Sequence, residues 1–232
     1  MNSMMIVGAA GGIGDYLCHR FWQEYRLLQV VHKNCPEIHD EYRPQPIVIQ
    51  TDIAQAWVLY EDELRALGDR IVLINAAGIS IDGMGHKLPP SDFSAVLNTN
   101  LLGVFNVCRR ILPLMRQSNW GRIINLSSVV GQIGVSGTAA YAASKAGLEG
   151  LTRTLAIENA RKGITVNTLR LGYMDIGMIN TLSYENRQAA ISRVPMLRLG
   201  HPENIVHAIK FLVAADYVTG TTIDIDGGVL CS

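Results

Sequence analysis

The fold is decided at residues 4–14, which read Met-Met-Ile-Val-Gly-Ala-Ala-Gly-Gly-Ile-Gly. Four apolar residues lead directly into a turn with four glycines, where a helix is expected to begin. Glycine allows tight turning and close approach of the backbone to a ligand, and the first turn of a helix offers unpaired N–H groups to phosphate. A glycine-rich turn alone is weak evidence. Its place between a first strand and a first helix predicts a dinucleotide-binding unit.

The same alternation of strand and helix continues along the chain. Several short apolar runs are apolar throughout, as in strands buried on both faces. Helical patterns separate them; Ile13, Leu17 and Phe21, for example, share one face. The pattern predicts an α/β protein with a Rossmann-type, doubly wound parallel sheet of about seven strands and helices on both faces. The expected strands are 4–7, 27–31, 47–49, 71–74, 123–126, 164–169 and 223–225.

We expect one domain over residues 1–232, because no linker, repeat or low-complexity stretch interrupts the rhythm. Two segments are irregular. Residues 34–46 hold three prolines and are expected to form a loop. Residues 172–200 are rich in Met and Gly and follow the sixth strand. Ligands bind at the carboxyl ends of such strands, so 172–200 is the expected substrate lid.

Composition narrows the partners. The net charge is zero, and no basic tract exceeds two residues, so neither nucleic acid nor an anionic membrane is an expected partner. Charged residues make up 17%, below the roughly 25% of an average domain. This suggests a surface covered by another subunit, although a larger buried fraction would look the same.

The patterns of cysteine, basic and histidine residues bear on the cellular location of the protein and on metal binding. The four cysteines show no CxxC pairing, no Lys or Arg precedes Arg20, and no run approaches the roughly 18 apolar residues of a membrane span. The protein is expected to be cytoplasmic. The six histidines show no metal-ligand spacing, so no metal site is expected.

The end of the second strand bears on the choice of dinucleotide. In an NAD site an acidic residue there binds the ribose hydroxyls and repels the 2′-phosphate of NADP. This chain has His32, Lys33 and Asn34, without an acid. Lys33 is expected to pair with the phosphate and His32 to donate a hydrogen bond to it, which favours NADP(H). The alternative is a solvated charge at a strand end.

A tyrosine and a lysine are the first candidates for chemistry. Tyr141 and Lys145 are four residues apart on an expected helix, so they share a face. A lysine ammonium favours the phenolate, which brings the tyrosine closer to useful proton transfer at neutral pH. Such a pair can protonate a carbonyl oxygen as hydride arrives, or deprotonate an alcohol in reverse. By itself it is as consistent with a surface helix pair.

Neighbouring polar residues strengthen that interpretation. Ser127 and Ser128 end the expected strand at 123–126, where a serine hydroxyl can hold a substrate oxygen or make a local turn bond. Asn100 falls inside a helical run, an unfavoured place for asparagine, and is a candidate for holding a water near the lysine. Asn98 is an equally polar neighbour. The residues alone do not choose between these two asparagines.

Together these motifs resemble the short-chain dehydrogenase/reductase superfamily, in its compact single-domain branch, over essentially the whole chain. The order and intervals of the motifs carry the resemblance, which is greatest to beta-ketoacyl-[acyl-carrier-protein] reductases. It implies that Asn100, rather than Asn98, and Ser128, rather than Ser127, join Tyr141 and Lys145 as the catalytic set. The cofactor-binding residues it implies are Gly8, Gly12, Ile13, Gly14, His32, Lys33, Asp52, Ile53, Asn75, Ala76, Gly78, Tyr141, Lys145, Gly172 and Met174.

Some family positions are altered, and they put the strength of cofactor binding in doubt. The most important is Ile176, where the family has a threonine that bonds the cofactor near its nicotinamide; losing that bond costs about 0.5–1.5 kcal/mol. The other departures are Val7, Gly11, Ala76 and Leu171.

The resemblance implies NADPH-dependent reduction of a ketone or beta-ketoacyl thioester, with Tyr141 as general acid, in fatty acid or polyketide biosynthesis. The substrate is expected to be a small molecule or bound to an acyl carrier. A homotetramer or homodimer, built partly through the helix after Tyr141, is also implied. Two alternatives stay open: an NAD-dependent alcohol, sugar or steroid dehydrogenase, and a non-catalytic dinucleotide-binding subunit.

Overall fold

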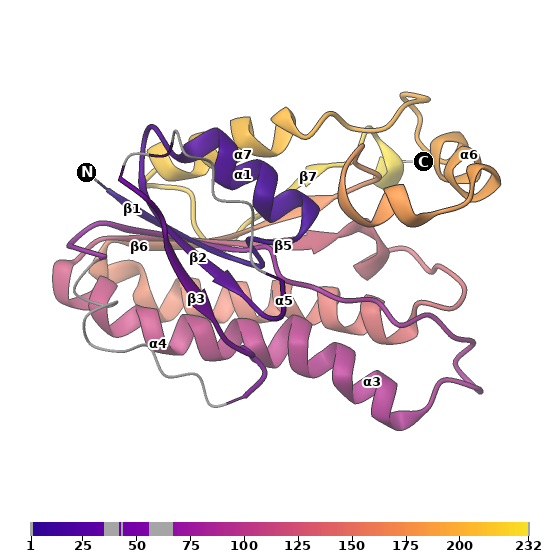
Figure 1. Ribbon diagram of the computed structural model, residues 1–232, viewed down its shortest axis with the longest axis horizontal. Coiled ribbons are helices and arrows are strands. Elements are labelled where there is room, and N and C mark those ends of the chain that lie inside the picture. The colour runs from indigo at the N-terminus through magenta and orange to yellow at the C-terminus, as the bar shows by residue number, and fades with distance from the viewer. Residues whose placement is uncertain (1, 35–41, 43, 56–66, 232) are drawn as a thin grey trace.

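The computed structural model describes residues 2–34, 42, 44–55 and 67–231, so most of the expected loop at 34–46 lies outside the described residues. At its centre is a seven-stranded parallel sheet of order β3-β2-β1-β4-β5-β6-β7 (Figure 1). The predicted sheet is confirmed. The strands are β1 (Ser3–Val7), β2 (Arg26–Val31), β3 (Ile47–Gln50), β4 (Ile71–Asn75), β5 (Gly121–Ser128), β6 (Ile164–Leu171) and β7 (Thr222–Ile225).

Helices cover both faces of this sheet. Figure 1 shows α1 and α7 on one face and α3, α4 and α5 on the other. The α-helices are α1 (Gly12–Phe21), α3 (Pro90–Leu97), α4 (Gly103–Ser118), α5 (Ala139–Asn159), α6 (Tyr184–Ser192) and α7 (Glu203–Ala214). Short helical turns are η1 (Asn98–Leu102), η2 (Val129–Gly131), η3 (Ala160–Lys162), η4 (Gly177–Thr181) and η5 (Val229–Cys231).

The sheet separates two apolar cores. All five residues of β1 are buried; Met5 and Val7 join the core under α4 and α5, whereas Met4 and Ile6 join the core under α1 and α7. This follows from the strand geometry, because successive side chains point to opposite faces. Burial on both faces explains why these strands are uninterrupted apolar runs in the sequence.

The strand order reverses between β1 and β4. β2 and β3 lie on one side of β1, and β4 to β7 follow on the other. The crevice at the carboxyl ends of two such neighbours is where open α/β sheets bind ligands. The glycine turn after β1 and residues 76–78 after β4 both lie at this point.

The segment at 172–200 contains two helical pieces, η4 and α6, rather than continuous loop. Its two ends meet: Gly200 N–H donates to Tyr173 O at 2.9 Å, and Asp175 N–H donates to Gly200 O at 2.9 Å. The segment therefore forms a closed excursion beyond the end of β6. In the part of the chain that the structure describes, no helix is long and apolar enough to cross a membrane.

Candidate active site

The glycine turn is shaped by contacts that only glycine permits. Gly8 has φ +85°, and a Cβ there would lie 2.7 Å from the Cα of Ala77. A Cβ on Gly14 would lie 2.1 Å from the carbonyl oxygen of Gly8. The turn therefore packs tightly between β1, the chain after β4 and the start of α1. No side chain caps α1, and Gly11 and Gly12 at its N-terminus are exposed, which leaves this helix end open to an anion.

The chain after β2 and β3 presents polar groups beside this turn. His32, Lys33 and Asn34 are exposed at the end of β2. After β3, a carboxylate oxygen of the half-buried Asp52 accepts a hydrogen bond from Ala54 N–H at 3.0 Å. Ile53 is buried in the core under α4, so only its backbone is open to a ligand.

Asn75, at the end of β4, is directed away from the crevice. Its Nδ2 donates to Oδ1 of Asn125 at 2.8 Å, and its side chain is buried under α4 and α5. Any contact of Asn75 with a ligand would go through its backbone. Ala76 N–H donates to Val7 O at 2.9 Å, which extends the pairing of β4 with β1.

Tyr141, Lys145 and Ser128 come together at the carboxyl end of β5. Nζ of Lys145 lies 5.5 Å from the centroid of the Tyr141 ring and donates to Leu126 O at 2.8 Å. Burial raises the pKa of Tyr141 to about 12, and its hydrogen bond with Ser128 acts in the opposite direction. Burial lowers the pKa of Lys145 to about 8. At neutral pH the tyrosine is therefore protonated and most of the lysine is charged.

The two neighbouring serines differ in what their hydroxyls do. Ser127 is buried, and its Oγ donates to Lys145 O at 3.0 Å, which ties β5 to α5. Ser128 is half-buried and lies beside Tyr141; its Oγ accepts a hydrogen bond from Val130 N–H at 3.3 Å. Of the two, Ser128 is the one placed to meet a ligand next to the tyrosine.

Asn100 is fully buried in a π-helical turn, η1, between α3 and α4. Its Oδ1 accepts from Ile79 N–H at 2.8 Å, and its Nδ2 donates to Ile79 O at 2.9 Å. The wider π turn thus fixes the chain that follows β4, consistent with the appearance of such turns at functional sites. Asn98 is exposed.

Gly78 brings the asparagine and the lysine to one point. A Cβ on Gly78 would lie 3.4 Å from Nζ of Lys145 and 3.5 Å from Oδ1 of Asn100. Residues from η1, β5, α5 and the chain after β4 therefore lie close together at this edge of the sheet.

Comparison with known proteins identifies this arrangement. A family model described as short chain dehydrogenase matches residues 2–187. The chain belongs to the short-chain dehydrogenase family. It is therefore an oxidoreductase with a nicotinamide dinucleotide cofactor, and the resemblance expected from the sequence is confirmed.

Individual members of the family cover nearly the whole chain. The 3-oxoacyl-[acyl-carrier-protein] reductase FabG of Thermotoga maritima is 37% identical over 97% of this chain and 96% of that protein. The acetoacetyl-CoA reductase of Allochromatium vinosum is 35% identical over 97% of each. Among solved structures, ElxO with NADP bound has a TM-score of 0.87 and 25% identity, covering 100% of this chain and 99% of that one.

The residues present fit the dinucleotide of a short-chain dehydrogenase. The glycine turn leaves no room for side chains where the pyrophosphate would approach, and the start of α1 is uncapped. The segment at 172–200 approaches this turn closely: a Cβ on Gly12 would lie 3.0 Å from Cα of Gly177. Gly172 N–H donates to Ile225 O at 2.9 Å. The apolar side chain of Ile176 packs against the core under α1 and α7.

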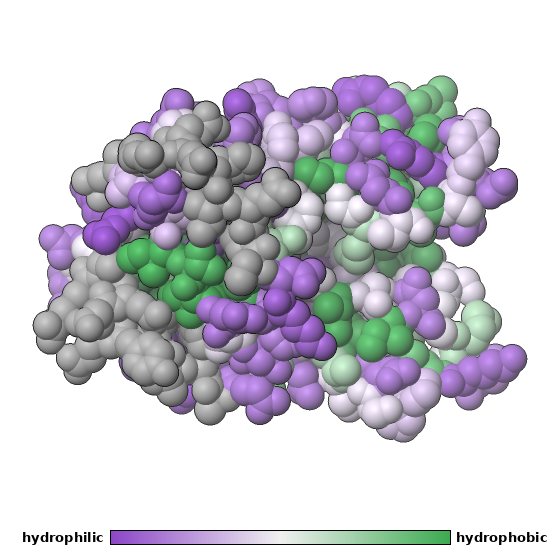
Figure 2. Space-filling model, in the orientation of Figure 1, coloured by the Kyte–Doolittle hydropathy of each residue, from purple (hydrophilic) through white to green (hydrophobic). Residues whose placement is uncertain are grey.

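The apolar residues of the segment at 172–200 divide into two groups. Met174 and Ile179 are buried, and a Cβ on Gly200 would lie 2.7 Å from Sδ of Met174. Met178 and Met196 are about half exposed. Figure 2 shows the surface hollowed between the side that carries α6 and the side that carries α3. Tyr173 packs against a small cluster of Val129, Val194 and Val229.

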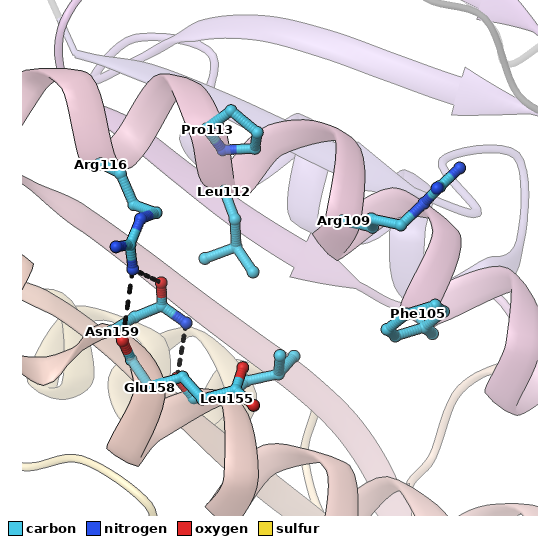
Figure 3. A pocket seen from close by; sticks show the side chains of 8 residues that line it. All are labelled: Phe105, Arg109, Leu112, Pro113, Arg116, Leu155, Glu158 and Asn159. Atoms are coloured by element: carbon cyan, nitrogen blue, oxygen red, sulfur yellow. Dashed lines mark hydrogen bonds between the residues drawn. The ribbon is translucent and has the colours of Figure 1, made fainter.

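A second hollow lies elsewhere, between α4 and α5, and none of the four candidate catalytic residues lines it (Figure 3). Arg116 closes one end by donating to Oδ1 of Asn159 at 2.8 Å. The residues that line this hollow are Phe105, Arg109, Leu112, Pro113, Arg116, Leu155, Glu158 and Asn159.

Among the described residues, no cluster of His, Cys, Asp or Glu side chains could hold a metal ion.

Proposed function

We propose that the chain uses NADPH to reduce a carbonyl group, a ketone or a beta-ketoacyl thioester, to an alcohol. The observation that carries the proposal is the convergence of Ser128, Tyr141 and Lys145 at the carboxyl end of β5. Its relatives include reductases named for acyl-carrier-bound and CoA-bound substrates. A substrate of this class, carried by a protein or by CoA, is therefore proposed here as well.

Each residue has a role that its surroundings support. Ser128 would hold the substrate oxygen beside Tyr141, and Tyr141 would donate its phenolic proton to that oxygen as general acid. Lys145 would stabilise the phenolate that results, because an ammonium close to the ring favours the charged form. When bound, the reduced nicotinamide supplies the hydride. Lys145 would also hold its ribose.

The protonation state of Tyr141 is compatible with reduction. A tyrosine with a raised pKa keeps its proton at neutral pH, which is the form that a reductase needs. Alcohol oxidation needs the phenolate instead. The exposed His32 and Lys33, with no acidic residue next to them in the sequence, support NADPH over NADH.

We also propose that copies of the chain pair through α4 and α5. Phe105, which lines the hollow of Figure 3, is 39% exposed, and Leu102, in η1 directly before α4, is 44% exposed. The outward side of α5 carries small residues, including Ala143, Ala146 and Gly150, which allow another helix to approach closely. Sedimentation analysis of the protein and of Phe105→Glu tests this pairing; a single monomeric species in both would contradict it.

The first experiment on function is an equilibrium titration with NADPH and, separately, NADH, followed by reduction assays with acetoacetyl-CoA and an apolar ketone. Tighter binding of NADPH and consumption of NADPH with either carbonyl support the proposal. Preference for NADH favours the oxidative dehydrogenase. If neither dinucleotide binds, the non-catalytic subunit is favoured, because altered residues such as Ile176 would then prevent binding even though the glycine turn is present.

A further inference from the structure

Ser144 lies on the first turns of α5, between the proposed acid and its lysine, and has no part in the roles given above. It is fully buried. Its hydroxyl donates to the carbonyl oxygen of Tyr141 at 2.7 Å and accepts from Nδ2 of Asn100 at 3.1 Å. One side chain thus links two residues of the site that belong to different elements, η1 and α5.

The direction of these hydrogen bonds is fixed by their partners. Ile79 N–H can only donate, so the amide atom of Asn100 that meets it is Oδ1, and the two protons of Nδ2 go to Ile79 O and to the Ser144 hydroxyl. The single proton of the Ser144 hydroxyl goes to Tyr141 O, which leaves a lone pair for Nδ2. The chain from Asn100 through Ser144 to Tyr141 has no donor or acceptor conflict.

The link between Ser144 and Asn100 lies next to the buried Lys145, so it bears on the proposed proton transfer. Asn100 stands in a π turn, a rare conformation that neighbouring contacts must hold. Its Oδ1 and the Lys145 ammonium flank the same point beside Gly78. Movement of η1 away from α5 would therefore open space next to the buried lysine and admit water there.

We propose that Ser144 is a positioning residue for the proton transfer. It holds η1 against α5 and so keeps the Asn100 amide beside Lys145. The inference rests on the proposed function, because it assigns importance to the geometry around Tyr141 and Lys145. Being fully buried, Ser144 acts through Asn100 and the backbone of α5.

The test compares Ser144→Ala with Ser144→Thr, which keeps a hydroxyl, by steady-state reduction kinetics over a range of pH. We expect kcat of Ser144→Ala to fall about fivefold to tenfold, because alanine removes the hydroxyl that links Asn100 to the backbone of Tyr141. KM for the carbonyl should change little. The midpoint of the kcat–pH profile of Ser144→Ala should shift, because the hydration around Lys145 changes. Ser144→Thr should recover most of kcat and the original midpoint.

Ser118→Ala is the matched control. Ser118 also lies in a helix and donates to the carbonyl three residues earlier, Met115 O, at 3.1 Å, but at the opposite end of the sheet. Its loss should leave kcat and the pH profile unchanged. A double-mutant cycle with Asn100→Ala keeps the test decisive if Ser144→Thr does not fold. Adding Ser144→Ala to Asn100→Ala should cost little more kcat, because both remove the same link.

Two results would overturn the inference. One is a Ser144→Ala protein with the original kcat and pH profile, whatever its melting temperature. The other is a double variant whose losses in kcat simply multiply. With turnover lost in Tyr141→Phe, either result removes this inference and leaves the proposed function standing. Near-normal turnover in Tyr141→Phe would remove both.

Discussion

The ammonium of Lys145 lies over the ring of Tyr141, 5.5 Å from its centroid, while its hydrogen bond goes to Leu126 O. The backbone of β5 therefore sets the position of the charge. Its influence on the tyrosine is electrostatic, and it grows when the phenolate forms.

Replacing Tyr141 with phenylalanine should lower turnover by about a hundredfold or more, because the proton donor is lost. The affinity for NADPH should change little. Steady-state kinetics and an equilibrium titration of Tyr141→Phe measure the two effects. Tyr217→Phe is the control, since Tyr217 is almost completely exposed and lies in the loop after α7. Near-normal turnover in Tyr141→Phe would show that Tyr141 is not the acid.

Lys145 should make the stability depend on pH. Its pKa falls from 10.5 when unfolded to about 8 when folded, so the unfolded chain binds more protons between pH 8 and 10.5 and stability rises with pH there. The penalty below pH 8 is about 2–4 kcal/mol. Tyr141, whose folded pKa is about 12, acts in the opposite direction only above pH 10.

Lys145→Met removes that penalty and should stabilise the protein at pH 7 while abolishing turnover. The stability difference from the original protein should narrow between pH 8 and 10, which urea unfolding at several pH values measures. A difference that stays constant over this range would mean that the buried lysine keeps an ordinary pKa.

The sheet was predictable because burial on both faces leaves uninterrupted apolar runs. Each expected strand is found, with ends shifted by two residues or fewer; β5, for example, spans Gly121–Ser128. The end of α5 was predictable for a local reason as well, since Arg161 and Lys162 are followed by Gly163 at φ +64°.

The parts of the site that depend on side-chain direction were not predictable. Asn75 carries a polar amide in the expected place, yet it is buried away from the crevice. The π turn at Asn100 leaves no periodic signal in five residues. Ser144 was missed, although its spacing of three residues from Tyr141 puts both on one helix face; spacing cannot tell which face is buried against η1.

Lys33→Glu should weaken binding of NADPH more than binding of NADH. A carboxylate at the exposed end of β2 would repel the 2′-phosphate and accept hydrogen bonds from a free ribose. Titration of both dinucleotides measures the ratio. Lys162→Glu changes the net charge equally at the opposite end of the sheet, before β6, and should leave the ratio unchanged. Equal weakening of both dinucleotides by Lys33→Glu would mean that Lys33 does not contact the phosphate.

Glu149→Ala should destabilise the fold by about 1.5–3 kcal/mol, because it removes the more buried of two carboxylates that pair with the guanidinium of Arg170 and leaves the more exposed Asp224. The two side chains are 5% and 13% exposed and form two hydrogen bonds of 2.9 Å. Urea unfolding measures the loss. Arg187→Ala breaks a far more exposed pair with Asp175 and should cost less than 1 kcal/mol. Similar losses for the two variants would show that burial does not strengthen the first pair.

Leu197→Gly should stabilise the protein by about 0.5–1 kcal/mol. Leu197 has φ +52° and is 71% exposed, so its side chain gains little from burial while its backbone is in the left-handed region. That conformation costs a residue with a Cβ about 1–2 kcal/mol. Glycine avoids this cost, but about 0.5–1 kcal/mol of the gain is lost because glycine gives the unfolded chain more conformational entropy.

Leu197→Ala keeps the Cβ and should not stabilise. Met196→Gly, next to it, should destabilise, because Met196 has no positive φ to relieve. Urea unfolding of the three variants separates the causes: equal stabilisation by alanine and glycine would mean that the exposed side chain, and not the backbone, is the source of the cost.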